Sequence, residues 1–279
     1  MSISFFNGDC LEVMKGLPDA SVDCFICDLP YGCLAGQNVN KGLKRIENGK
    51  ETGKRAETEN GLLQGCSWDI KLNLELFWEQ VKRLRKADNS PCLMFCTTKF
   101  GNDLINSNPK EFRYDLVWNK QRGVSFLTAS KMPMRSHEMV YIFSKAGAYY
   151  KRVDIDAPGK KARCEIIETF SLKNNKRSNA FLPSSGILKT KMDENKKCVL
   201  TILDIGNCHK QGGHPTEKPM ALYKFLIDRY CPADGVILDP TAGSFNSCFT
   251  AYEMGRDAIG IEKDDGFFKK AKARAEAML

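Results

Sequence analysis

The sequence predicts an α/β protein built on a doubly wound, mostly parallel sheet of seven strands. Short apolar runs of strand length alternate with segments of helical periodicity, which is typical of a parallel sheet covered by helices. The chain has 279 residues, 42% of them hydrophobic, and is long enough for one large domain with a buried core. In chain order the expected strands are 3–8, 22–27, 92–97, 114–118, 139–144, 235–238 and 258–261.

Two stretches interrupt this alternation and are expected to be insertions in the domain, which spans 1–279. Residues 33–67 are polar, rich in Gly and Lys and almost free of apolar periodicity, so they predict a long polar loop. Residues 148–213 are basic and contain only short strand-like pieces, at 164–170 and 199–203.

Composition indicates the kind of partner and the compartment. The formal net charge of +8 favours a polyanionic partner. Many of the twelve cysteines lie in apolar runs, as expected for reduced core cysteines of a cytoplasmic protein. Cys24 and Cys27 have the spacing of a metal half-site, but no second pair follows at a zinc-ribbon distance, so no metal is predicted. We see neither a signal peptide nor an apolar run of membrane-spanning length.

The tetrad Asp28-Leu29-Pro30-Tyr31 directly follows the second expected strand. It places an acid, a rigid turn and an aromatic side chain at the carboxyl edge of the sheet, where open α/β sheets carry their active sites. An acid that caps a turn beside an ordinary aromatic would give the same four residues. The tetrad therefore needs support from the rest of the chain.

A second edge motif begins at Asp239 and runs through Pro240, Thr241, Ala242, Gly243 and Ser244 into an expected helix. Small residues let a backbone approach a ligand, and a helix N-terminus offers unpaired N–H groups. About 20 residues further on, Glu262 ends the next strand, where a carboxylate can hold both ribose hydroxyls. The alternative is a generic nucleotide fold in which Glu262 is a solvated charge.

Together these segments resemble the DNA amino-methyltransferases, which modify N6 of adenine or N4 of cytosine. The tetrad is similar to their Asp-Pro-Pro-Tyr signature, with Leu29 in place of proline. The second motif is similar to their Asp-Pro-Phe-x-Gly-Ser-Gly cofactor loop, with Thr241 in place of the aromatic residue and Phe245 in place of the second glycine. Phenylalanine adopts the positive φ of a glycine only at a cost, so Phe245 is the departure that matters most.

Further segments extend the resemblance over residues 3–275. His214-Pro215-Thr216-Glu217-Lys218-Pro219 is close to the family's His-Pro-Thr-Gln-Lys-Pro, and Asn7-Gly8-Asp9-Cys10 resembles its Gly-Asp element. Residues 116–120 and 136–145 resemble strands on the target-base side, where His137 and Glu138 are expected to organise hydrogen bonds. The tetrad precedes the cofactor loop, the order found in the circularly permuted beta class. A Rossmann-like methyltransferase sheet is therefore expected.

The resemblance implies methyl transfer from S-adenosylmethionine to adenine N6 of a base flipped out of double-stranded DNA. Asp28 and the Leu29 carbonyl would accept hydrogen bonds from the amine, Pro30 would hold the turn, and Tyr31 would stack on the base. Adenine is favoured because Asp in the first position is commoner among the adenine enzymes. The implied cofactor-binding residues are Asp9, Cys10, Lys218, Asp239, Thr241, Ala242, Gly243, Ser244 and Glu262.

The insertion at 148–213 lies where the family has its target-recognition region. Its basic residues Lys151, Arg152, Lys160 and Lys161 are expected to contact phosphates, and Lys41, Lys44 and Arg45 in the first loop form a second basic patch. Each of these lysine and arginine side chains would fit a solvent-exposed charged surface as well as a DNA contact. The resemblance leaves open a homodimer and a partner restriction enzyme.

Three other functions remain open at this point. Cytosine N4 is the close alternative to adenine N6. Leu29 and Phe245 motivate a DNA-binding module with an impaired cofactor pocket. An RNA or protein-glutamine methyltransferase would use the same hydrogen-bonding chemistry, although the permuted order disfavours it.

Overall fold

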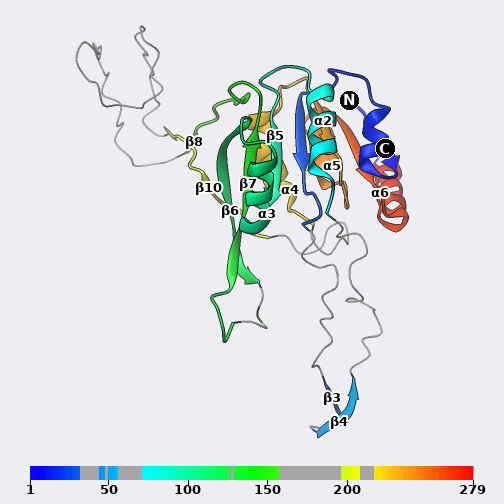
Figure 1. Cartoon of the computed structure of the whole chain (residues 1–279), viewed down its shortest axis with the longest axis vertical. Helices are drawn as coiled ribbons and strands as arrows, with labels where there is room; N and C mark the ends of the chain where they lie inside the picture. The colour runs from blue at the N-terminus through cyan, green and yellow to red at the C-terminus, as the bar shows by residue number, and fades with distance from the viewer. Residues whose placement is uncertain are drawn as a thin grey trace, which may run out of the picture. The chain divides into compact units, whose positions relative to one another are not determined.

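A computed structural model of the chain describes residues 1–31, 71–124, 126, 129–156, 196–207 and 217–278, and the backbone of 44–47 and 50–55. Its centre is an eight-stranded sheet in the order β1-β12-β11-β2-β5-β7-β6-β10 (Figure 1). The strands are β1 (Ile3–Asn7), β2 (Cys24–Cys27), β5 (Cys92–Cys96), β6 (Phe112–Val124), β7 (Arg135–Phe143), β10 (Ile202–Asp204), β11 (Val236–Asp239) and β12 (Asp257–Glu262).

Every neighbouring pair in this sheet is parallel except those made by β7, which runs antiparallel to β5 and β6. From β11 the chain continues to β12, which β1 flanks on its outer side, and from β2 it continues in the opposite direction to β5. The order therefore reverses between β11 and β2. In open α/β sheets, ligands bind at the carboxyl ends of the strands beside such a switch point.

Helices cover both faces of the sheet because the central strands are buried on both sides. All four residues of β2 are buried, and successive side chains alternate between the faces. One face packs against the first three helices and the other against the last three, as ring contacts from Trp78 to Phe143 and from Tyr223 to Phe95 indicate. The helices are α1 (Cys10–Lys15), α2 (Leu74–Leu84), α3 (Thr98–Ser107), α4 (Met220–Tyr230), α5 (Asn246–Glu253) and α6 (Asp265–Met278).

The predicted sheet is confirmed for all seven strands, and one strand was missed. β10 joins the edge by pairing in parallel with β6, from Ile202 opposite Val117 to Asp204 opposite Asn119. Only Leu203 of its three residues is buried. So short a strand with one buried side chain leaves no period-two pattern to read, although 199–203 did stand out as strand-like.

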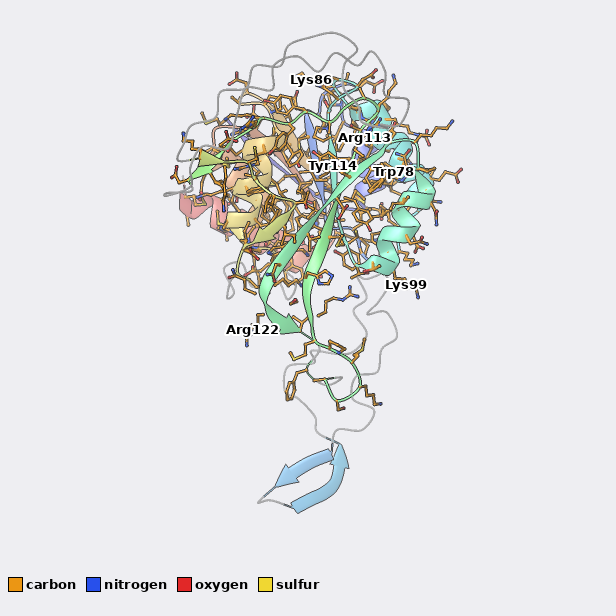
Figure 2. The ribbon with its side chains drawn as sticks, turned by 90° about the vertical axis from the view of Figure 1, so that its left-hand side faces the viewer. Trp78, Lys86, Lys99, Arg113, Tyr114 and Arg122 are labelled. Atoms are coloured by element: carbon orange, nitrogen blue, oxygen red, sulfur yellow. The ribbon has the colours of Figure 1, made fainter. Side chains whose placement is uncertain are left out.

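β6 and β7 extend past the end of β5 at the carboxyl edge of the sheet. β5 pairs with β7 only as far as Cys96 opposite Met139, whereas β6 and β7 stay paired through Asn119 opposite His137 and meet again at Val124 opposite Arg135. Both strands are therefore longer than the expected 114–118 and 139–144. Arg122 lies on this extension (Figure 2).

The two expected insertions differ from their predicted outlines. Residues 152–200 form a separate compact unit, which is shorter than the predicted insertion at 148–213. The flanking residues belong to the sheet domain, because the Tyr149 and Lys151 N–H groups bond to its carbonyls and β10 is one of its strands. Within that unit β8 (Ile155–Asp156) pairs with β9 (Lys196–Lys197). The stretch 33–67, expected to be irregular, contains an antiparallel pair, β3 (Lys44–Glu47) and β4 (Lys50–Arg55). The strand-like piece 164–170 lies outside the described residues.

No helix in the described ranges is both long and apolar enough to cross a membrane. The same ranges hold no group of three or more His, Cys, Asp or Glu side chains placed to bind a metal ion.

Candidate active site

The predicted site residues converge at the switch point of the sheet. Asp28 follows β2, Asp239 ends the adjacent β11, and Glu262 ends β12. Because these strands are parallel, their carboxyl ends meet at one edge. Residues more than two hundred positions apart in the chain thus form one site.

Both carboxylate oxygens of Asp28 accept hydrogen bonds. The Tyr31 hydroxyl donates to Oδ1 at 2.8 Å, and the Lys218 ammonium donates to Oδ2 at 2.6 Å. Burial, reinforced by the nearby carboxylates, raises the pKa of Tyr31 well above its ordinary value, so its hydroxyl stays protonated. The Tyr31 ring lies 5.1 Å from that of Phe100. Tetrad and lysine thus form one hydrogen-bonded unit.

Leu29 turns its side chain into the hydrophobic core and is only 2% exposed. Because the Leu29 side chain packs in the core, only the backbone of this residue is available to the site. Pro30 next to it is half-buried. Where the family signature has a proline, this chain therefore has an apolar residue that packs into the core.

Lys218 is held by two carboxylates at once. Its Nζ lies 2.6 Å from Asp28 Oδ2 and 3.5 Å from Glu138 Oε2, while the Lys120 ammonium binds Glu138 Oε1. Burial alone would lower the pKa of Lys218, but Asp28 and Glu138 outweigh it and raise the pKa above its ordinary value. Burial likewise opposes ionisation of Glu138, yet Lys218 and Lys120 hold its pKa below the ordinary value. Both Lys218 and Glu138 therefore stay ionised at neutral pH.

The predicted cofactor loop is closed by hydrogen bonds to carboxylates. The Thr241 N–H donates to Asp239 Oδ1 at 3.1 Å, and the Gly243 N–H donates to Glu262 Oε2 at 2.8 Å. Gly243 has φ +52°, a backbone form that costs a glycine little. Ala242 is buried and Ser244 half-buried. The Thr241 hydroxyl is buried and has no hydrogen-bond partner in the described part of the chain.

Phe245, which stands where the family signature has a glycine, takes a left-handed conformation with φ 58° and ψ 20°. Its side chain is fully buried, and its ring stacks 5.0 Å from that of Phe5. Gly260 leaves room for it, since a Cβ there would lie 2.4 Å from Phe245 Cε1. The ring thus points into the core and away from the loop, which removes the steric objection to a cofactor.

The N-terminal element is near the loop, but only one of its two predicted residues presents its side chain there. Asp9 caps α1 and pairs with Lys263, the residue after Glu262, at 3.1 Å. The Cys10 thiol is instead buried in the core, and burial together with Asp9 raises its pKa to about 11. Only the backbone of Cys10 is therefore available to contact a ligand.

Asn246, the first residue of α5, is a site residue that the sequence reading missed. Its Nδ2 donates to the Lys218 carbonyl at 3.2 Å, and its Oδ1 accepts from Arg274 at 2.7 Å. Ser247 next to it donates to Asp239. These contacts tie the cofactor loop to the lysine that holds Asp28. An Asn-Ser pair at a helix start was the available signal, since both are polar residues inside an apolar segment.

The predicted DNA-binding residues are only partly described. Lys151 pairs with Asp228 at 3.3 Å, and Arg152 makes two hydrogen bonds to Asp154, at 2.7 and 3.0 Å. These acids compete with phosphates for both cations. Lys44 and Arg45 lie in β3, of which only the backbone is described. Outside the described residues lie Lys41, Lys160, Lys161, His214, Pro215 and Thr216.

The buried Asp239 predicts a pH dependence of stability. Burial raises its pKa from 3.8 to about 7, despite hydrogen bonds from Ser247 and the Thr241 N–H. The folded protein therefore binds this proton more tightly, and the stability it contributes below pH 4 is lost as pH rises through 7. The loss is up to about 1.4 kcal/mol per pH unit.

Denaturant unfolding of wild type and Asp239→Asn between pH 4 and 8 measures this contribution. The stability of the variant relative to wild type should rise with pH across that range. Two curves that stay parallel would show that Asp239 does not titrate there.

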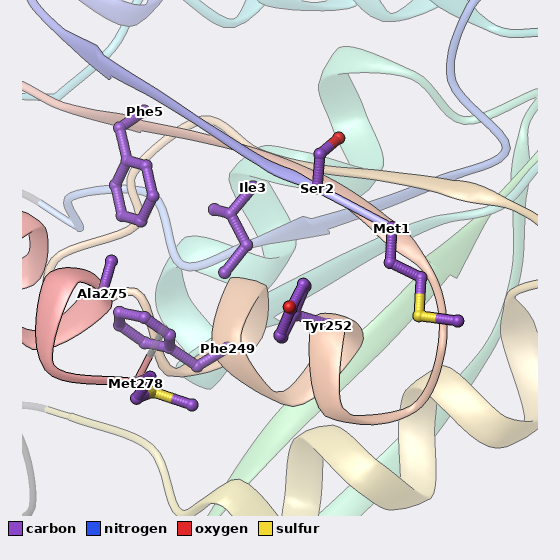
Figure 3. Close-up of a pocket in the computed structure, with 8 residues that line it drawn as sticks. All are labelled: Met1, Ser2, Ile3, Phe5, Phe249, Tyr252, Ala275 and Met278. Atoms are coloured by element: carbon purple, nitrogen blue, oxygen red, sulfur yellow. The ribbon is translucent and has the colours of Figure 1, made fainter.

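A separate apolar pocket of about 280 Å³ lies at the β1 edge of the sheet (Figure 3). Residues near both chain ends line it, among them Met1, Phe5, Phe249 and Met278. None of the predicted site residues contributes to it. It is a feature of the sheet edge rather than part of the site.

Comparison with known proteins shows the family to which the chain belongs. The model of a family described as DNA methylase, of the N6/N4 type, matches residues 22–273. Type II methyltransferase M.HindIII from Haemophilus influenzae is 39% identical over 302 residues, covering 96% of this chain and 94% of that protein. Type II methyltransferase M.ScaI from Streptomyces caespitosus is 24% identical, covering 99% and 82%.

Solved structures share the fold at lower identity. The cytosine-N4-specific PvuII DNA methyltransferase superposes with a TM-score of 0.61 at 15% identity, covering 98% of this chain and 86% of that one. The complex of M1.HpyAVI with SAM gives 0.55 at 17% identity, covering 98% and 99%. Since the family match covers most of the sequence and M.HindIII is similar over almost its whole length, this chain belongs to the N6/N4 family of DNA methylases.

Proposed function

We propose that this DNA methylase transfers a methyl group from S-adenosylmethionine to N6 of an adenine flipped out of double-stranded DNA. The observation that carries the proposal is the meeting of Asp28 with the Asp239–Glu262 loop at the switch point of the sheet. The carboxylate that would accept hydrogen bonds from the target amine and the loop that would bind the cofactor thus lie at the ends of adjacent strands. Lys218 and Asn246 join the two halves.

The residues of the loop suit S-adenosylmethionine. When bound, the cofactor supplies an activated methyl group on its sulfonium sulfur. The Glu262 carboxylate would accept from the ribose hydroxyls, and the buried Thr241 hydroxyl, which has no partner among the described residues, is a polar group that a ligand would satisfy. Asp9, the N-cap residue of α1, would reach the adenine of the cofactor, and the Phe245 ring stays out of this space.

Asp28 and the Leu29 carbonyl would activate the target amine. An exocyclic amine is a weak nucleophile because its lone pair is delocalised into the ring, and two acceptors on its hydrogens draw that lone pair back toward the nitrogen. Leu29 can serve in this way because a backbone carbonyl does not depend on the side chain, which here lies in the core. After transfer, the amine carries a surplus proton that leaves to Asp28 or to water.

Tyr31 and Pro30 would hold the flipped base. The Tyr31 ring would stack on the base, while its hydroxyl bonds to Asp28 Oδ1 in this structure. This bond keeps the ring beside the carboxylate that would accept from the amine. Pro30 limits the freedom of the turn between them.

The extension of β6 and β7 supports DNA as the polymer that reaches this edge. From 116 to 137 the sequence contains four Lys or Arg residues and no Asp or Glu. Arg122, Lys131 and Arg135 are exposed, as are Phe126 and Met132. A basic arm with apolar side chains, placed beside the amine acceptors, suits a phosphate backbone next to a displaced base.

Replacing Arg122 with glutamine is expected to weaken binding to a short mixed-sequence duplex and to lower the slope of log affinity against log salt by about 1. Lys110→Gln is the matched control, because Lys110 is exposed at the opposite end of β6. Fluorescence titrations at several salt concentrations measure both. Equal slopes in the two variants would remove the arm from the DNA interface.

Nucleoside analysis by mass spectrometry tests the proposed reaction. Unmethylated genomic DNA is incubated with the protein and S-adenosylmethionine and then digested, and N6-methyladenine is expected. N4-methylcytosine alone would assign the cytosine alternative, for which the fold of the PvuII enzyme is the supporting observation. Methylation of RNA but not DNA, or failure to bind the cofactor by calorimetry, would overturn the proposal.

A further inference from the structure

Four buried or half-buried charged side chains of alternating sign form a connected series that begins at the proposed catalytic carboxylate. They are Asp28, Lys218, Glu138 and Lys120, with side chains 22%, 5%, 15% and 10% exposed. Asp28 follows β2, Lys218 precedes α4, and Glu138 and Lys120 lie on β7 and β6. Two positive and two negative side chains thus compensate one another in a site with little exposure to solvent.

Glu138 is not fully satisfied within this group. The Lys120 ammonium binds its Oε1, but its Oε2 is buried without a hydrogen bond from the described residues and lies 3.5 Å from Lys218 Nζ. A buried carboxylate oxygen without a donor is costly, and such groups are rare in folded proteins. Lys218 meanwhile is much closer to Asp28, at 2.6 Å. The lysine therefore has a second carboxylate within reach that it does not yet fully use.

An incoming amine needs Asp28 as its acceptor, and both oxygens of Asp28 already accept a bond. Lys218 competes with the amine because it is a charged donor with the shorter contact. With Asp28 as its only counter-ion, Lys218 could not move without leaving a buried charge unpaired. Glu138 removes that obstacle, because a small displacement of the ammonium brings it from one carboxylate to the other.

We propose that Glu138 is a positioning residue of the methyl transfer, acting as the second counter-ion that lets Lys218 release Asp28 to the target amine. Lys120 keeps Glu138 ionised and fixed. Lys218 retains its three protons throughout, so only its hydrogen-bond partner changes and no covalent bond is involved. This inference rests on the proposed function, because it assigns Asp28 the amine.

Glu138→Gln tests the inference, since it removes the charge and keeps the shape. We expect kcat to fall by about tenfold or more. The affinity for S-adenosylmethionine by calorimetry should stay within about twofold, because Glu138 does not touch the cofactor loop. Glu138→Asp restores the charge and should have a kcat at least about threefold above that of Glu138→Gln. A purely structural role would not separate kcat from cofactor affinity in this way.

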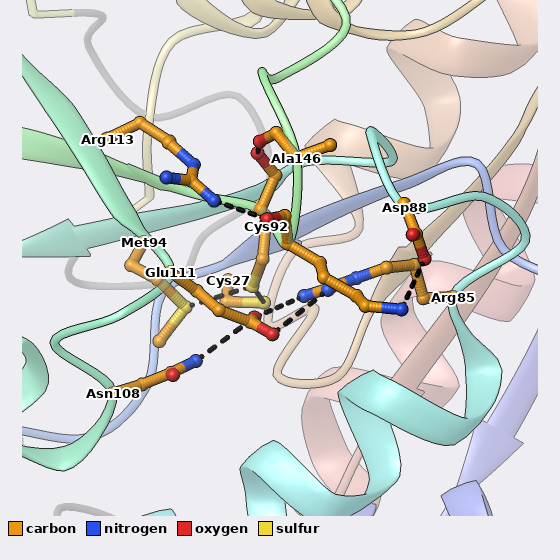
Figure 4. A network of polar contacts seen from close by, with 11 residues as sticks. Cys27, Arg85, Asp88, Cys92, Met94, Asn108, Glu111, Arg113 and Ala146 are labelled. Atoms are coloured by element: carbon orange, nitrogen blue, oxygen red, sulfur yellow. Dashed lines mark hydrogen bonds and ion pairs between the residues drawn. The ribbon is translucent and has the colours of Figure 1, made fainter.

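Glu111→Gln is the matched control (Figure 4). Glu111 is also a buried carboxylate bonded to a buried cation, with Arg85 Nη2 2.6 Å away, but it precedes β6 at the opposite edge of the sheet. Its loss should lower the melting temperature and leave kcat within about twofold. The pair of variants separates general weakening of a buried ion pair from an effect on catalysis.

A double-mutant cycle with Lys218→Met completes the test. If Glu138 acts through Lys218, then Glu138→Gln changes kcat little once Lys218 is gone. Additive losses, a wild-type kcat in Glu138→Gln, or loss of cofactor affinity in parallel with kcat would overturn the inference while the proposed function stands. A wild-type protein that transfers no methyl group to DNA would overturn both.

Discussion

Asp28→Ala is expected to lower kcat by about a hundredfold to a thousandfold, the loss seen when a preorganised hydrogen-bonding group is removed from a transition state. The methyl donor is already activated, so the difficult step is to recover the lone pair of the amine, and Asp28 is the charged member of the acceptor pair. Affinity for S-adenosylmethionine should change little, because the carboxylate bonds to Tyr31 and Lys218 and not to the loop. Single-turnover kinetics and calorimetry measure the two quantities.

Asp23→Ala is the control for this experiment. Asp23 lies just before β2, at the opposite end from Asp28, and also accepts a bond from a lysine, Lys86, at 3.0 Å. It further accepts the Val236 N–H at 2.9 Å, so its removal should weaken the fold and spare kcat. If cofactor binding and activity disappear together in Asp28→Ala, the assignment of Asp28 to the amine is wrong.

Phe245→Ala is expected to destabilise the protein by about 3–5 kcal/mol, the usual cost of truncating a buried phenylalanine. Phe245→Gly should be more stable than Phe245→Ala by about 1 kcal/mol, because only glycine takes a positive φ without strain. This order is the reverse of the one expected inside a regular helix. Urea unfolding of the two variants measures it, and an alanine variant as stable as glycine would refute the left-handed conformation.

The neighbouring strand provides a second measurement of the same packing. Gly260→Ala places a Cβ 2.4 Å from Phe245 Cε1 and 2.8 Å from Cys248 Sγ, so it should be strongly destabilising in wild type. In the Phe245→Gly background much of that cost should vanish, because the ring is gone. Full additivity of the two changes would mean that the ring does not lie over Gly260.

The edge of the sheet at which the site lies could be predicted from the sequence, because the carboxyl ends of parallel strands meet wherever the strands are neighbours. Asp28, Asp239 and Glu262 each follow or end an apolar run, which places them at the same edge, while the strand order that brings them together came from the structure. β10, in contrast, could not be predicted from its own sequence. A strand of three residues is specified by its partner β6 rather than by its own pattern.

Side-chain direction was the part that the sequence could not supply. Lys218 was expected at the cofactor, yet its ammonium binds Asp28, 190 residues away, and only its carbonyl is tied to the loop through Asn246. The direction of the Phe245 ring depends on Phe5 and on the missing side chain of Gly260, which belong to other strands. These side-chain directions are determined by three-dimensional packing, so the local sequence carries no periodic pattern that would predict them.

Asn246 is expected to couple cofactor binding to DNA binding. Asn246 is the first residue of the helix after the cofactor loop, and its side-chain amide donates to the carbonyl of Lys218, whose ammonium binds Asp28. A displacement at the cofactor loop is therefore expected to reach Asp28, and the reverse. Thermodynamic linkage then imposes reciprocity: the factor by which S-adenosylmethionine tightens the hold on DNA must equal the factor by which DNA tightens the hold on S-adenosylmethionine. The cooperativity between the two substrates can therefore be measured from either one.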